Sequence, residues 1–178
     1  MTPTDDSAAD SPSPNLPDPG RLAGIDFGTV RIGIAISDPS RRWASPLEIR
    51  TRSGQEADAK YFLRLVREHD LTGFVVGLPI HLDGRESEKS SQARAFAEWL
   101  GKLTSLPVVL FDERYTSVEA ENYLLAADMT RKRRKKRIDK VAAQILLAAY
   151  LDSIRAKSRL EDEADAHQRF DDPGSIDG

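Results

Sequence analysis

Between residues 21 and 51 the apolar residues form three short runs joined by only a few residues. Arg21–Phe27 is almost continuously apolar, which predicts a buried strand, and Arg31–Ser37 alternates with a period of two, which predicts a second strand. Gly28 and Thr29 between them are typical of a turn, and Trp43–Thr51 predicts a third strand. Because a parallel pair needs a long crossover, strands joined this closely are predicted to form an antiparallel meander.

Downstream of residue 51, helical and extended patterns alternate. The predicted helices are 59–69, 90–103, 117–127 and 138–154, and the predicted strands are 74–80 and 108–111. The third helix opens with a capping box, in which Thr116 is followed three residues later by Glu119. Strands separated by helices pair in parallel through crossovers. The whole order predicts an α/β protein with a mixed five-stranded sheet and helices on both faces, an order that resembles the RNase H-like fold.

The two ends of the chain differ from the part between them. Residues 1–20 contain five prolines and four acidic residues, and residues 159–178 are polar and acidic, so both are predicted to be disordered tails. Residues 21–158 are the predicted folded domain. The tails 1–20 and 161–178 together carry a charge of −10, which leaves +7 on residues 21–160 although the whole chain has −3. A basic core of this kind favours an anionic partner such as nucleic acid.

Composition removes several classes of site. The chain has no cysteine, so disulfides, cysteine-bound zinc and a thiol nucleophile are excluded, in agreement with a reducing cytoplasm. Its three histidines are scattered, which disfavours a histidine-rich metal site. The most apolar stretch is far shorter than the roughly 20 residues that a membrane-spanning helix needs, and no secretory signal is recognisable. We therefore expect a cytoplasmic protein without a membrane segment.

Acidic residues end two of the predicted strands and open the last helix. Asp26 lies at the end of an apolar strand, where a carboxylate is costly to bury unless it is paired or bound to a metal. Asp112 and Glu113 follow strand 108–111, and Asp139 starts the last helix, at the edge of its predicted buried stripe. That stripe consists of Ile138, Ala142, Ile145 and Ala149.

These carboxylates are predicted to converge, because strand ends that flank a switch point form the usual crevice of an α/β sheet. Three or four oxygen ligands suit Mg²⁺ or Mn²⁺, and two such ions promote phosphodiester cleavage. Taken singly, Asp26 also fits a turn, Asp112 a surface position, and Asp139 the favourable charge at a helix N-terminus. Their joint placement favours the metal site.

The strongest charge feature lies just before Asp139. It is an unbroken run of cations: Arg131, Lys132, Arg133, Arg134, Lys135, Lys136 and Arg137. Adjacent cations repel one another, so the run is predicted to be a loop that contacts the phosphate backbone of a nucleic acid, the alternative being a merely solubilising segment. Arg31 and Arg114 are further candidates for phosphate contact, and each equally fits a structural ion pair.

Four sequence blocks resemble, in the right order, the signatures of the YqgF/RuvX family. They are G-I-D-F-G-T-V-R-I-G-I-A-I-S-D, V-V-G-L-P, D-E-R-Y-T-S and R-I-D-K-V-A-A-Q-I-L-L-A-A-Y-L-D. The resemblance covers residues 22 to about 152. It implies an RNase H-like nuclease that matures the 5′ end of pre-16S rRNA, with Asp26, Glu113 and Asp139 as catalytic metal ligands and Asp112 as a further candidate. Pre-rRNA is the favoured partner, and branched DNA is the alternative.

One departure from the related RuvC-type resolvases bears on activity. Those enzymes carry their second acid at the end of the fourth strand, whereas here that strand ends in Gly77-Leu78-Pro79-Ile80, so the D-E-R block has to supply it. Holliday-junction resolution in DNA repair stays an alternative, and it would require a homodimer to cut two strands; the sequence leaves monomer and homodimer both open.

Two other functional classes, nucleotide binding and non-catalytic RNA binding, also fit parts of the sequence. The D-F-G-T hairpin also resembles the phosphate-binding hairpin of the actin, Hsp70 and sugar-kinase superfamily. That architecture needs two such domains closing on a nucleotide, and this chain has room for one. A non-catalytic RNA-binding assembly factor would keep the fold without cleaving anything, and the intact acids argue against it.

Overall fold

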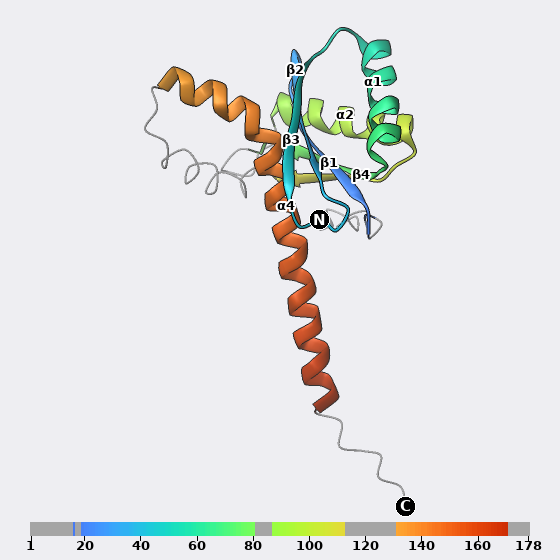
Figure 1. The fold of residues 1–178 in the computed structure, drawn as a ribbon, viewed down its shortest axis with the longest axis vertical. Coiled ribbons are helices and arrows are strands. Elements are labelled where there is room, and N and C mark those ends of the chain that lie inside the picture. The colour runs from blue at the N-terminus through green and yellow to red at the C-terminus, as the bar shows by residue number, and fades with distance from the viewer. Residues whose placement is uncertain (1–15, 17–18, 81–86, 113–130, 171–178) are drawn as a thin grey trace, which may run out of the picture.

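The computed structural model describes residues 16, 19–80, 87–112 and 131–170, with side chains described from 141 to 163 in the last of these segments (Figure 1). Residues 1–15 and 17–18 of the predicted tail 1–20, residues 171–178 of the predicted tail 159–178, the predicted helix 117–127, Glu113 and Arg114 lie outside the described residues.

The core of the structure is one five-stranded mixed sheet. Its strands are β1 (Arg21–Phe27), β2 (Arg31–Ser37), β3 (Ala44–Thr51), β4 (Leu71–Leu78) and β5 (Val108–Asp112). They lie in the order β3-β2-β1-β4-β5, with β1, β2 and β3 antiparallel and with β4 parallel to both β1 and β5. The predicted meander and parallel crossovers are therefore confirmed, and the C-terminal ends of β1, β4 and β5 share one edge of the sheet.

Two helices cover one face of this sheet (Figure 1). They are α1 (Gln55–His69) and α2 (Glu88–Thr104). Alternate residues of β1 and β2, including Ile25 and Ile34, are buried against Phe62 of α1 and Phe96 of α2, whose rings contact edge to face with centroids 5.7 Å apart. A fully buried side chain of this size contributes about 1.5–3 kcal/mol to folding. Among the described residues, more buried side chains lie on this face than on the other, so it holds the larger share of the core.

Among the described elements, helix α4 (Arg131–Phe170) covers the opposite face. Leu22 and Val75 of the sheet are buried there against Leu147 and Leu151. The approach is close because Gly24 has no side chain: a Cβ at Gly24 would lie 2.7 Å from the Cβ of Leu147. A glycine in this strand is therefore required by helix packing.

Most element bounds differ from prediction by a few residues. The ends of β1 and β2 match the prediction, whereas α1 begins at Gln55, and β4 begins at Leu71 and stops before Pro79, which has no N–H to donate to a neighbouring strand. Helix α2 begins two residues earlier than predicted, after Ser87, whose hydroxyl accepts a hydrogen bond from the backbone N–H of Ser90.

The larger difference concerns α4. The basic run 131–137 forms its first turns, not a loop, and the helix continues to Phe170, beyond the predicted domain end at residue 158. Arginine and lysine are good helix formers, and turns added to an existing helix avoid the cost of nucleation, which outweighs the repulsion between adjacent cations. At the other end the sequence contains no glycine or proline between residues 141 and 170 to stop the helix.

Candidate active site

A cleft of about 290 Å³ lies at the end of β1, lined by residues 26–31 together with Gly33 and Ile49. Asp26 and Arg31, both singled out in the sequence, are therefore brought to one place. Gly28 makes the tight connection between the two strands, because a Cβ there would lie 2.5 Å from the carbonyl oxygen of Arg31.

Asp26 lies on the sheet face that α4 covers. Side chains alternate along β1, and Leu22 and Gly24 both face α4, so Asp26 takes the same side. Asp26 is paired with Gly33 across β1 and β2, and a Cβ at Gly33 would lie 3.5 Å from the Cβ of Ala143 and 3.7 Å from Oδ2 of Asp26. The missing side chain at Gly33 thus leaves open the space beside the half-buried Asp26 carboxylate.

Asp139 precedes Ala143 by four residues in α4, which is about one helical turn. The sequence placed Asp139 at the edge of a stripe through Ala142 and Ile145. In the structure the buried face is instead centred on Ala143 and Leu147, while Ala142 and Ile145 are only partly buried. The backbone of Asp139 therefore lies about one helical turn before the residue that contacts the sheet next to Asp26.

Asp112 ends β5, opposite Leu78 of β4, at the same edge of the sheet as Asp26. Its neighbour Phe111 packs on Tyr150 of α4, with ring centroids 5.6 Å apart. Because successive residues of a strand point to opposite faces, Asp112 is directed to the side of α1 and α2, away from the face of Asp26.

The predicted phosphate contacts are placed only in part. Arg31 is exposed and lines the cleft. The basic run 131–137 occupies the turns of α4 that lead directly to Asp139. Among residues with described side chains, no three carboxylates or histidines gather into a metal site, and neither Glu113 nor Asp139 belongs to that set.

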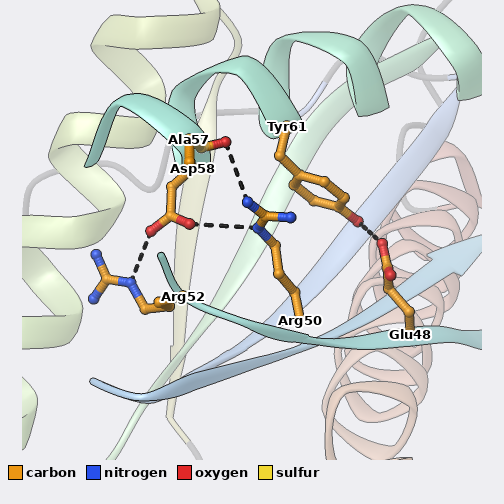
Figure 2. A network of polar contacts seen from close by, with 6 residues as sticks. All are labelled: Glu48, Arg50, Arg52, Ala57, Asp58 and Tyr61. Atoms are coloured by element: carbon orange, nitrogen blue, oxygen red, sulfur yellow. Dashed lines mark hydrogen bonds and ion pairs between the residues drawn. The ribbon is translucent and has the colours of Figure 1, made fainter. Parts of the chain in front are cut away.

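A polar network that the sequence did not predict joins β3 to α1 beside the cleft (Figure 2). The Asp58 carboxylate is fully buried, and it accepts hydrogen bonds from Nε of Arg52 at 2.9 Å and from Nε of Arg50 at 3.4 Å. The hydroxyl of Tyr61 donates to Glu48, and burial together with this carboxylate acceptor raises the pKa of Tyr61 above its usual range. The alternation of Glu48, Arg50 and Arg52 along β3 and the residue after it is a signal in the sequence that could have revealed this charged face.

The described part of the chain contains no helix that is long and apolar enough to span a membrane.

Comparison with known proteins identifies a family and several relatives that this chain resembles. A family model described as RuvX, Holliday junction resolvase, matches residues 20–153. A protein of Rhodopirellula baltica named "Putative pre-16S rRNA nuclease" is 50% identical over 145 residues, covering 82% of this chain and 84% of the relative. A protein of the same name from Paracoccus denitrificans is 45% identical over 146 residues, covering 82% and 92%.

The fold is also found among solved structures. Thermus thermophilus RuvC in complex with a Holliday junction substrate is similar with a TM-score of 0.54 and 15% identity, covering 76% of this chain and 96% of that chain. At this identity the likeness concerns the fold, and it confirms the predicted RNase H-like architecture.

Proposed function

This chain belongs to the RuvX family, and from that premise we propose that it is a cytoplasmic, metal-dependent nuclease that processes the 5′ end of pre-16S rRNA. The observation that carries the proposal is the position of Asp26. Its carboxylate lines an open cleft, on the sheet face covered by the helix in which Asp139 lies one turn before the contact residue Ala143.

The second acid of the proposed site is Glu113. The alternation of β5 directs Phe111 toward α4 and Asp112 away from it, on the side opposite the face of Asp26. This orientation disfavours Asp112 as the partner of Asp26, and the family resemblance assigns that role to Glu113, which lies outside the described residues.

The donor chemistry suits a hard cation. We propose that Asp26, Glu113 and Asp139 hold a pair of Mg²⁺ or Mn²⁺ ions, because carboxylate oxygens are the ligands that such hard cations prefer. When bound, such ions lower the pKa of water and neutralise charge on the leaving oxygen. The protein's own part is to hold Asp26 on a strand and Asp139 on a helix, and to keep the space at Gly33 open beside Asp26.

Cations around the cleft favour a polyanionic substrate. Arg31 lines the cleft, and the run 131–137 lies in the turns of α4 that precede Asp139. We propose that both contact phosphates, which position the substrate without reading its sequence. The description of the matching family as a Holliday junction resolvase favours branched DNA as the second candidate substrate.

The test is metal-dependent cleavage of a panel that contains a pre-16S rRNA 5′ segment and a four-way DNA junction. Asp26→Asn removes the charge that a cation requires, so cleavage is expected to fall by at least about 100-fold while the unfolding transition stays unchanged. Excess EDTA should have the same effect on the unmodified protein. The matched control is Glu98→Gln on α2, an exposed acid paired with Lys102 at 2.6 Å, which should cleave normally. Full activity of Asp26→Asn would exclude the proposed site, and the preferred member of the panel separates the two substrates.

A further inference from the structure

The guanidinium of Arg52 is anchored at Nε, whereas its two terminal nitrogens contact no acceptor among the described residues. Its Nε donates to the buried Asp58, and its side chain is 26% exposed. Figure 2 shows the two terminal nitrogens of Arg52 turned away from the Asp58 carboxylate. Among the described residues no acceptor contacts these nitrogens, so hydrogen-bond donors of the guanidinium remain available to a ligand.

The cleft adjoins Arg52 directly. The backbone N–H of Arg52 donates to the carbonyl oxygen of Val30 at 2.9 Å, and its guanidinium carbon lies 5.2 Å from the centroid of the Phe27 ring. Val30 and Phe27 both line the cleft that contains Asp26. Arg52 is therefore held at the rim of the candidate active site by its backbone, by an aromatic ring and by an ion pair.

The two arginines at this edge lie on opposite faces of the sheet. Arg52 reaches Asp58 on α1, whereas Arg31 precedes Ile32, which is buried against α1 and α2, so Arg31 alternates to the α4 face. Asp26 lies in the adjacent strand. A sugar–phosphate backbone that crosses the edge of the sheet would meet one cation on each side of the cleft.

We propose that Arg52 binds a backbone phosphate of the nucleic acid at the rim of the cleft, and that Asp58 is the positioning residue that orients its guanidinium. The inference rests on the proposed function and adds a contact that the family resemblance does not assign. A guanidinium with its Nε anchored still offers terminal N–H groups to phosphate oxygens, and anchoring reduces the side-chain entropy lost on binding.

Arg50 provides a matched control within the same network. It shares the Asp58 carboxylate, but its Nη2 donates to the carbonyl oxygen of Ala57 at 3.2 Å and its guanidinium carbon lies 4.3 Å from the Tyr61 ring centroid. Substituting either arginine removes one ion pair from Asp58. Only substitution of Arg52 should remove a phosphate contact.

The experiment measures the affinity of the full chain for two probes in EDTA, where cleavage is prevented. The probes are an RNA stem–loop with a single-stranded 5′ extension and a four-way DNA junction, each titrated over a range of salt concentrations. Loss of one phosphate contact reduces the slope of log affinity against log salt by about 0.7 for a single strand and about 0.9 for duplex DNA. Arg52→Gln is expected to show this reduction, whereas Arg50→Gln is expected to keep the slope of the unmodified protein. Arg52→Lys retains the positive charge and is expected to keep most of that slope.

The outcomes separate this inference from the proposed function. An unchanged slope for Arg52→Gln, or equal reductions for Arg50→Gln and Arg52→Gln, overturns the phosphate contact even if the unmodified protein cleaves the panel. Failure of the unmodified protein to bind either probe overturns both. Urea unfolding of each variant verifies that the affinities are compared between folded proteins.

Discussion

The Asp58 carboxylate is fully buried at the junction of α1 and β3, so its charge needs strong hydrogen-bond partners within the protein. Removing a carboxylate from water costs several kcal/mol unless strong partners replace the lost hydration. Arg50 and Arg52 supply those partners, and the backbone of Arg52 is bonded in turn to the turn at Val30. One buried acid thus connects the first helix with the rim of the cleft.

We expect Asp58→Ala to lower the free energy of unfolding by about 3 kcal/mol, because it leaves two guanidinium groups without their shared partner. The value lies at the low end for buried pairs, since both arginine side chains keep partial contact with water. The control is Glu56→Gln, which removes an exposed ion pair with Lys60 on the same helix and should cost less than about 1 kcal/mol. Urea unfolding measures both, and equal small effects would show that the network contributes little to stability.

Among the elements, α4 determines most of the candidate site. Among the described helices it is the one that covers this face of the sheet, it carries Asp139 near its start, and its distance from the sheet depends on Gly24 and Gly33. A helix that packs on glycine approaches closely, and it has no flexible side chain at the contact to absorb a displacement. The spacing between Asp26 and the start of α4 is therefore sensitive to a single methyl group.

We accordingly expect Gly24→Ala to displace α4, because the added Cβ would lie 2.7 Å from the Cβ of Leu147 and 3.0 Å from the carbonyl oxygen of Ala143. Overpacking of this kind costs about 1–3 kcal/mol, and cleavage should fall as well through misplacement of Asp139. Gly101→Ala in α2 is the control, since its Cβ would lie 3.4 Å from Val108, an ordinary contact, and alanine favours the helix. Thermal unfolding and the cleavage assay measure both variants; a Gly24→Ala protein with normal stability and activity would contradict this account of the packing.

The molecule as a whole consists of the sheet with its covering helices and the C-terminal part of α4, which extends away from the sheet (Figure 1). Arg155 connects this helix to the rest of the chain, donating from Nη1 to the carbonyl oxygen of Arg42 at 3.2 Å. Residues 156–163 are all exposed. The described side chains of the projecting part therefore lie outside the apolar core.

Deleting residues 159–178 should consequently change the free energy of unfolding by less than about 1 kcal/mol, because the described side chains of this segment are exposed and a surface ion pair such as Lys157–Glu161 contributes little. The loss of helical signal in circular dichroism should exceed the loss of stability. Chemical denaturation of the full and shortened chains tests this expectation. A large destabilisation would show that the segment docks on the domain, or on a second copy, which sedimentation of both chains would detect.

Periodicity in the sequence determined the sheet. The period-two pattern of β2 and the continuous apolar run of β1 are both typical of strands in a buried sheet. The bounds Arg21–Phe27 and Arg31–Ser37 therefore followed directly from the sequence. Linker lengths then decided which strands pair antiparallel and which need crossovers. The position of Asp26 at a strand end also followed from local pattern, because it depends only on neighbours in the chain.

Contacts between distant segments decided what the sequence did not reveal. The roles of Gly24 and Gly33 appear only when α4 lies against them, and the ion pairs of Asp58 require β3 and α1 to be side by side. The buried face of α4 was misassigned by one position, because its many alanines and leucines allow several apolar stripes and only the sheet selects one. Local patterns define which surfaces can be buried, whereas the partner that buries them is a property of the tertiary structure.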